Sequence, residues 1–336
     1  MAEISIIVPI YNAENYLFQC LESLSDQLFK DIEIICVDDS STDSSSTILA
    51  KAASRDKRIK IYTQSENRGV EIARHKGLLE ARGKYIMFCD ADDWYEPEMC
   101  QEMYNVMELG GVDLAICKTS VFKEGDKEHL YNYSYFDFAI GGIENINIAL
   151  INNINTVLWN KIFRRDIIEK HNITFPEFKD IRLGWDEFFV LEYMLVSKKI
   201  FFLDKVLHNY RVRNDSLTGD MYCKVSKNYE DVWNGLEKFY NILFSKSLLN
   251  DEVMEFFLSK YSYKTKHYFD FLPSLEDRIK ALNDTREFLE NVAKTQASAL
   301  EFKDKYLRSL LMMTYDYMMR NKSVVSEGED KEEKEV

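Results

Sequence analysis

The sequence predicts an α/β fold, a doubly wound and mostly parallel sheet followed by an all-helical C-terminal extension. Short apolar runs alternate with segments of helical spacing over residues 1–117, a pattern typical of parallel strands joined by crossover helices. After about residue 218, long helical patterns follow one another with no strand between them. We therefore expect a sheet domain at 1–217, a helical appendix at 218–321 and an acidic disordered tail at 322–336.

The first elements are bounded by residues that end strands or begin helices. Ile4–Val8 is an apolar strand that stops at Pro9, and Asn12 is a residue type that caps a following helix. Apolar residues then recur at helical spacing over Tyr16–Phe29. By the same criteria we expect strands at 32–37, 58–62, 85–89 and 113–117, and helices at 44–53, 70–81 and 97–109.

Regular structure is less clear in the middle of the chain. Asn160 and Lys161 interrupt the apolar run Val157–Phe163 and look buried. Between 118 and 217 we expect a loop or irregular strands at 119–137, helices at 143–151, 166–171 and 188–196, and short strands at 200–203 and 206–212. The C-terminal helical patterns cover 222–244, 251–268, 275–292 and 297–319.

Composition and missing motifs exclude several classes of protein. The net charge is −14 with no stripe of Lys and Arg, which argues against a nucleic-acid partner. Six scattered cysteines form no Cys-x-x-Cys pair, so we expect buried thiols in a reducing compartment. The sequence also has no Gly-x-Gly-x-x-Gly after its first strand, no P-loop, no His-Glu-x-x-His and no Gly-x-Ser-x-Gly.

Polar residues stand at the carboxyl ends of four expected strands: Tyr11, Asp38–Asp39, Asn67–Gly69 with Arg74, and Asp90–Asp93. In a parallel sheet these ends open on one edge, where ligands bind. Tyr11 offers a ring for a base, Asp39 an acceptor for a pyrimidine imino hydrogen, and Arg74 a phosphate contact. A divalent cation on Asp92 would bridge two phosphates. Each residue alone also suits core packing, helix capping or a surface charge, but their shared edge favours a site.

Four segments resemble, in order and with approximate spacing, the motifs of family 2 glycosyltransferases of the GT-A fold. They are Ser5–Asn12, Glu33–Asp43, Asn67–Gly69 with Ala73 and Arg74, and Tyr85–Asp93. Trp159–Phe163 and Asn209–Arg211 look like segments of bacterial members that extend surface lipooligosaccharide, lipopolysaccharide or capsule.

The resemblance implies inverting transfer of a hexose or N-acetylhexosamine, of galactose type, from a UDP-sugar to an oligosaccharide or lipid-linked glycan acceptor, with Mg²⁺ or Mn²⁺. Residues 1–117 would form the nucleotide-sugar half and 118–217 the acceptor and catalytic half. Asp92, with Asp90 nearby, would hold the metal. The implied nucleotide-sugar contacts are Pro9, Tyr11, Glu14, Asp38, Asp39, Asn67, Gly69, Arg74, Asp90 and Ala91.

The family's catalytic base lies in a Glu-Asp pair before a helix, which is similar to Trp185–Phe189 here. Asp186 is the candidate base and Glu187 the alternative, because Trp185 replaces the usual Glu and Glu187 follows the Asp. Both acids also suit a helix N-terminus. Trp185, His208 and Arg211 are further candidates on the acceptor side.

Two other functions stay open at this point: an inactive nucleotide-sugar-binding or scaffold protein, and a nucleotidyltransferase, which would need a Gly-rich basic loop after the first strand. The Met-, Leu- and Tyr-rich segment Tyr306–Arg320 favours helix packing or a homodimer contact, with a lipid surface as the alternative. With no secretory leader and no apolar run of about 18 residues, we expect a cytoplasmic protein, at most peripheral on the inner membrane.

Overall fold

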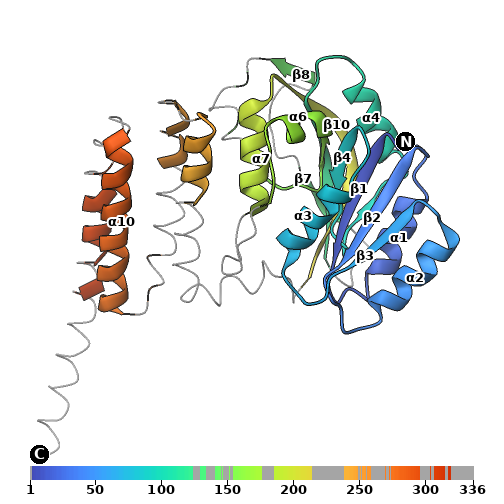
Figure 1. Ribbon diagram of the computed structural model, residues 1–336, viewed down its shortest axis with the longest axis horizontal. Coiled ribbons are helices and arrows are strands. Elements are labelled where there is room, and N and C mark those ends of the chain that lie inside the picture. Colours follow the sequence, from blue (N-terminus) through green and yellow to red (C-terminus); the bar gives the residue numbers. More distant parts are fainter. Residues whose placement is uncertain are drawn as a thin grey trace, which may run out of the picture. The chain divides into compact units, whose positions relative to one another are not determined.

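The computed structural model divides the chain into two compact units, Met1–Gly219 and Asp220–Val336, which are described separately (Figure 1). The expected boundary after residue 217 lies beside this division. The described residues are 2–123, 129–133, 141–144, 146, 151, 154–175, 185–213, 238–248, 250, 252–254, 256–258, 269, 272, 274–295, 303, 306–314 and 317–318. Within them, no helix has the length and apolar character needed to cross a bilayer.

One sheet forms the framework of the first unit, with the principal strand order β3-β2-β1-β4-β9-β6-β10-β5. Its parallel strands β3, β2, β1 and β4 are Ile59–Thr63, Ile32–Asp38, Ile4–Ile10 and Tyr85–Phe88. Every residue of β1, β2 and β4 is buried, as expected for strands covered on both faces. The predicted α/β class, with a parallel N-terminal sheet, is confirmed.

Helices cover the two faces of this sheet. On one face, Ile6 and Val8 of β1 join the core formed with α1 (Leu17–Ser25), α2 (Ser45–Arg55) and α4 (Met99–Met107). On the other face lies α3 (Val70–Glu80), whose Gly77 lies directly against Ile7 of β1. Phe88 of β4 faces this second layer too, and its ring contacts Phe163, Phe175 and Phe189 edge-on.

Mixed pairing extends the sheet beyond β4. The antiparallel strand β9 lies between β4 and β6, and β10 runs parallel to β6. Because β6 crosses the expected division after residue 117, the two expected halves share one sheet. The remaining elements are β5 (Trp94–Tyr95), β6 (Leu114–Lys123), β7 (His129–Tyr133), β8 (Gly141–Glu144), β9 (Lys161–Arg164), α6 (Arg165–Lys170), α7 (Trp185–Val196) and β10 (Lys199–Val212).

Several local expectations are corrected by cross-strand pairing. At the start of the helix expected at 143–151, Ile143 and Glu144 belong instead to β8 and pair with β10. Residue 151 is helical, while residues 145 and 147–150 lie outside the described part. The two strands expected at 200–203 and 206–212 are one strand, β10, with irregular register between Leu203 and His208. Pairing with a neighbouring strand outweighs local sequence preference at such positions.

The first turn of the chain also differs from expectation. β1 does not stop at Pro9 but continues to Ile10, and proline is tolerated because β4 pairs with β1 only as far as Ile7. Asn12 does not cap the next helix, which begins at Leu17. Its Oδ1 atom accepts a hydrogen bond from the Thr42 amide instead, at 2.8 Å.

Buried polar and thiol groups agree with two further expectations. Asn160 and Lys161 are both fully buried. Lys161 Nζ donates to the Val157 carbonyl at 2.7 Å and to Asn160 Oδ1 at 2.9 Å. The cysteines in the described part of the chain, Cys20, Cys36, Cys89, Cys100 and Cys117, are free and buried, whereas Cys223 lies outside it.

The second unit is helical where it is described. α10 spans Leu275–Thr295, and its Phe288 ring contacts Tyr240 and Phe257. In the segment expected to make a helix or lipid contact, residues 306–314 are helical. Leu310 is buried there, while Leu311 and Met312 are exposed. Much of the expected helices at 222–244, 251–268 and 297–319, and the tail at 322–336, lies outside the described residues.

Candidate active site

Polar residues gather where β1, β2 and β4 end, because these parallel strands are neighbours. Tyr11 directly follows β1, Asp39 follows β2, and Asp90 lies just beyond β4. The Tyr11 side chain is 49% exposed, so its ring is available to stack on a planar ligand. Pro9 and Ala91 are buried at this edge, so their contribution is to the course of the backbone.

The loops after β1 and β2 are bonded to each other. The Ser44 amide donates to Glu14 Oε2 at 2.9 Å, which joins the two loops. Within the second loop, the Ser41 amide donates to Asp38 Oδ1 at 3.0 Å. Asn12 has φ of 48°, an uncommon conformation that asparagine tolerates better than most residues. The side chains of Glu14 and Asp38, expected at the nucleoside, therefore fix loop backbone in this structure.

Asp39 organises the turn before α3. Its Oδ1 accepts hydrogen bonds from Gln64 Nε2 at 2.7 Å and from the Arg68 amide at 2.9 Å, and its Oδ2 accepts one from the Gly69 amide at 2.7 Å. Asn67 Oδ1 accepts from the same Gly69 amide at 3.2 Å. Since a carboxylate offers about four acceptor positions, Asp39 keeps capacity for one more donor, such as the imino group of a pyrimidine.

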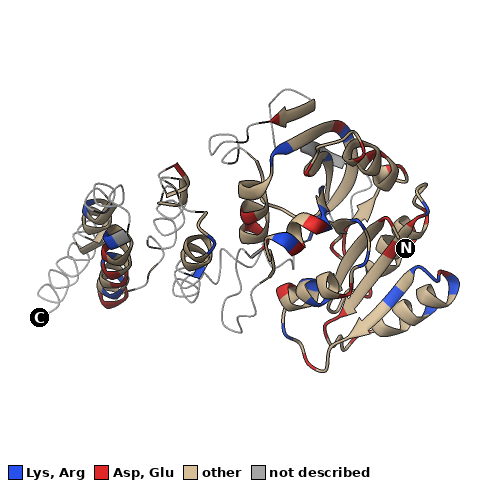
Figure 2. Cartoon of the chain, turned by 45° about the horizontal axis from the view of Figure 1, so that its top comes forward, with Lys and Arg blue, Asp and Glu red and all other residues tan. Residues whose placement is uncertain are grey.

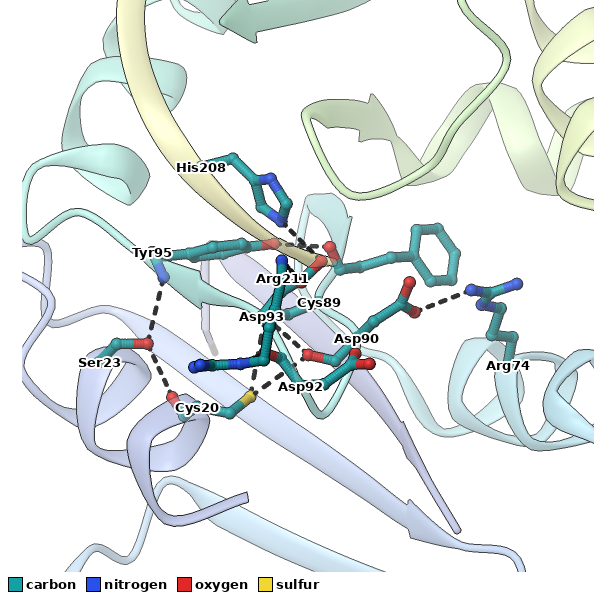
Figure 3. Close-up of polar contacts among 11 residues, drawn as sticks. Cys20, Ser23, Arg74, Cys89, Asp90, Asp92, Asp93, Tyr95, His208 and Arg211 are labelled. Carbon is teal, nitrogen blue, oxygen red and sulfur yellow. Dashed lines mark hydrogen bonds and ion pairs between the residues drawn. The ribbon is translucent and has the colours of Figure 1, made fainter. Parts of the chain in front are cut away.

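Arg74 joins two acidic residues from different elements. It lies in α3 and is 6% exposed. Its Nη2 contacts Asp90 Oδ1 at 2.8 Å, and its Nη1 lies 4.0 Å from Asp186 Oδ2. Figure 3 shows the Asp90 carboxylate turned toward this guanidinium. The structure thus places Arg74 between the loop after β4 and α7, rather than pointing away into solvent.

The two candidates for the base lie in the first turn of α7. Asp186 is half-buried, whereas Glu187 is buried, so Asp186 is the more accessible carboxylate. Burial raises the pKa of Asp186, and the neighbouring Arg74 charge opposes that rise. The side chain of Trp185 lies outside the described part.

Three aspartates, Asp90, Asp92 and Asp93, lie in the loop after β4, and their negative charges repel one another. Burial, with the adjacent charges of Asp93 and Asp90, raises the pKa of Asp92 to about 7. Burial also raises the pKa of Asp93 well above its ordinary value, and Asp90 adds to this. Negative charges held this close in a poorly solvated loop favour the approach of a cation.

The last strand of the sheet supports this loop from the side. The fully buried His208 ring lies with Nε2 3.2 Å from Asp93 Oδ2. The Arg211 amide donates to Asp93 Oδ1 at 2.9 Å, and Arg211 Nε donates to the Asp92 carbonyl at 2.9 Å (Figure 3). His208 and Arg211, expected on the acceptor side, are therefore turned to the aspartate loop, His208 is fully buried there, and their acceptor-side role stays a prediction.

A divalent cation is the group that the family resemblance implies at this loop. Asp92 would hold it, with Asp90 nearby, and each of the two carboxylates is paired with an arginine in this structure, Asp92 with Arg213 at 3.0 Å and Asp90 with Arg74 at 2.8 Å. In the described part of the chain, no three His, Cys, Asp or Glu side chains converge as a complete ligand set. The donor chemistry nevertheless fits, because Mg²⁺ takes one or two carboxylates and completes its shell with phosphate oxygens and water.

Some contributors to the site were not recognised in the sequence. Gln64 orients Asp39, and Tyr16 and Trp94 flank the Arg211 guanidinium at 5.2 and 4.8 Å. The sequence did carry a signal for the arginines at this loop. Arg211 and Arg213 are two residues apart, so an extended strand puts both side chains on one face. Gln64 carries no comparable signal, because its role depends on a fold contact 25 residues away.

Comparison with known proteins identifies the family of this chain. The model of the family described as Glycosyl transferase family 2 matches residues 5–171. The chain is 30% identical to glycosyltransferase GlyG of Streptococcus pneumoniae over 64% of its own length and 72% of GlyG. It is 32% identical to EpsH of Bacillus subtilis, again over 64% of its length, and the match spans 62% of EpsH, a little under two thirds.

A solved structure shares the fold. The crystal structure of S. aureus TarS 1-349 in complex with UDP-GlcNAc superimposes with a TM-score of 0.72 at 22% identity, covering 94% of this chain and 89% of that one. The predicted GT-A fold is thereby confirmed. Sequence and fold agree, and the chain belongs to glycosyl transferase family 2.

Proposed function

We propose that this protein is an inverting glycosyltransferase that moves a hexose or N-acetylhexosamine from a UDP-sugar to a glycan acceptor in the assembly of a bacterial surface polysaccharide. The observation that carries the proposal is the position of Arg74. It joins Asp90, in the loop expected to hold the sugar diphosphate, to Asp186, the candidate base, across 2.8 and 4.0 Å. This supports the proposal, because a residue expected at the donor and the candidate base both lie within 4.0 Å of one arginine.

In this mechanism Tyr11 stacks on the uracil ring and Asp39 accepts its imino hydrogen. Asp186 takes the proton of the acceptor hydroxyl while that oxygen attacks the anomeric carbon and the bond to the diphosphate breaks. The raised pKa of Asp186 suits a base that works near neutral pH. Asp92 would hold a divalent cation, which would supply positive charge to stabilise the departing diphosphate.

The donor assignment draws on the TarS structure determined in complex with UDP-GlcNAc, and on the acceptor position that Asp39 keeps for one further donor, such as the imino group of a pyrimidine. We place the enzyme on the cytoplasmic side of the inner membrane, where sugar nucleotides are available, with an oligosaccharide or lipid-linked acceptor. The galactose-type donor predicted from the resemblance competes with N-acetylglucosamine, and a panel of UDP-sugars distinguishes them.

Asp186→Asn tests the proposal directly. The variant keeps the shape of the side chain and removes its basicity, so UDP-sugar binding by calorimetry stays near normal while transfer falls by about 10²–10⁴-fold. Glu187→Gln is the matched control and keeps most activity. Near-normal turnover in Asp186→Asn refutes the base assignment. If the unaltered protein binds UDP-sugars but releases no UDP with any acceptor in a mixed panel, it is an inactive binding protein instead.

A further inference from the structure

Arg213, just beyond the end of β10, is paired with the carboxylate that the metal would need. Its Nη1 lies 3.0 Å from Asp92 Oδ2. The pair is largely shielded from solvent, with 19% of the Arg213 side chain and 25% of the Asp92 side chain exposed. The guanidinium also lies over the Tyr16 ring, 4.9 Å from its centroid. Both contacts hold the Arg213 guanidinium in one place.

The neighbouring Arg211 makes this arrangement specific rather than incidental. Arg211 and Arg213 are two residues apart on an extended segment, so their side chains leave the same face. Arg211 holds the backbone of the loop through the Asp92 carbonyl and also donates to Gln19 Oε1 at 2.6 Å. Arg213 takes the Asp92 carboxylate. One arginine fixes the position of Asp92, and the other neutralises it.

A guanidinium and a divalent metal ion compete for the negative charge of this one carboxylate, even where each contacts a different oxygen atom. A metal ion binds a carboxylate oxygen at about 2.0–2.6 Å, inside the distance of the present hydrogen bond. The metal and the guanidinium would also repel each other across a poorly solvated site. Asp92 therefore has two alternative cationic partners, one built into the chain and one from solution.

We propose that Arg213 is an internal counter-ion that competes with the divalent cation for Asp92 and is displaced when the metal binds. This inference rests on the proposed function, because it assumes that Asp92 is the metal ligand. In the protein without donor, Arg213 offsets the mutual repulsion of Asp90, Asp92 and Asp93. Metal affinity is then set partly by the free energy needed to break the Arg213–Asp92 pair.

Manganese titration of the full chain without nucleotide, with free Mn²⁺ followed by electron paramagnetic resonance, tests the competition. Arg213→Gln removes the competing charge, so we expect its Kd for Mn²⁺ to be about 2- to 5-fold lower, as for loss of a partly exposed ion pair. Arg213→Lys keeps the positive charge but loses the planar guanidinium, so its Kd for Mn²⁺ lies between those of the unaltered chain and Arg213→Gln. Asp92→Asn abolishes the site in either background.

A second arginine supplies the matched control. Arg164 also forms an ion pair with an aspartate, Nη2 to Asp166 Oδ2 at 2.6 Å. In the sheet its backbone lies opposite Tyr85, at the end of β4 that is far from Asp90. Arg164→Gln thus removes the same charge without touching Asp92 and leaves the Kd unchanged. The competition is refuted if Arg213→Gln binds Mn²⁺ no more tightly than the unaltered chain, if its gain survives in Asp92→Asn, or if none of these proteins binds Mn²⁺. UDP binding by the unaltered chain, measured separately, reports on the proposed function.

Discussion

Gly77 is the point where α3 comes closest to the sheet, and replacing it with alanine separates two opposing effects. A Cβ atom at this position would lie 2.4 Å from Ile7 Cγ2, whereas carbon atoms in contact prefer about 3.5–4.0 Å. The shortfall exceeds about 1 Å. Ile7 is fully buried in the central strand β1, and its branched side chain has few rotamers to escape into.

The sign of the stability change follows from comparing magnitudes. Overpacking of a buried site costs about 1–3 kcal/mol, while alanine gains about 1 kcal/mol over glycine inside a helix. Because the clash is with a rigid core residue, we expect the upper part of the cost and a net loss of about 1–2 kcal/mol for Gly77→Ala. Arg74 lies one turn earlier on α3, so UDP affinity falls as well.

Urea unfolding of single and double variants checks this reasoning. Ile7→Ala alone costs about 2–5 kcal/mol through its cavity. With Ile7→Ala present, the added methyl of Gly77→Ala occupies that cavity, so the double variant is more stable than the two single losses predict. An unfolding free energy for Gly77→Ala equal to or above that of the unaltered chain, or simple additivity in the double variant, would contradict a close contact here.

Three further substitutions probe the polar groups. Burial lowers the pKa of Lys161 to about 7 from an ordinary value of 10.5. Between these values the unfolded chain binds more protons than the folded chain, so the free energy of unfolding rises with pH. Urea unfolding of Lys161→Met from about pH 7 to about pH 10 should show a smaller rise in that free energy. Asp39→Asn turns a side-chain amide toward the N–H donors that now point at the carboxylate, so the rise in melting temperature caused by UDP should disappear. An unchanged rise would exclude Asp39 as a contact of the uracil ring. Tyr193→Phe removes bonds to the Asp113 carbonyl and from the Arg164 amide, at 2.7 and 2.8 Å, and costs about 1–3 kcal/mol, measured by chemical denaturation.

The sequence predicts the strand ends well because burial on both faces leaves an uninterrupted apolar run that polar residues must terminate. Tyr11, Asp39 and Asp90 were placed on one edge by this argument, and the parallel pairing of β1, β2 and β4 brings their strand ends together. The metal and base roles of Asp92 and Asp186 stay predictions.

What the sequence could not predict are the contacts that side chains make across the fold. Local pattern assigns His208 only to a strand, while its burial against Asp93 depends on β10 passing beside the aspartate loop. The two-residue strand β5 is too short to have a periodicity, and it forms because Tyr95 pairs with His208. Glu14 and Asp38 likewise bond to loop amides whose position no single segment determines.

The support of the aspartate loop by β10 has a consequence for how the protein is made. The ribosome completes Asp93 long before Arg211, which follows it by 118 residues. A nascent chain halted after residue 171, where the family match ends, contains β1 to β4, all three aspartates and Arg74. It lacks His208, Arg211 and Arg213, which contact Asp92 and Asp93. The contacts that complete the support of the aspartate loop are therefore expected to form late in translation, when β10 pairs with β6.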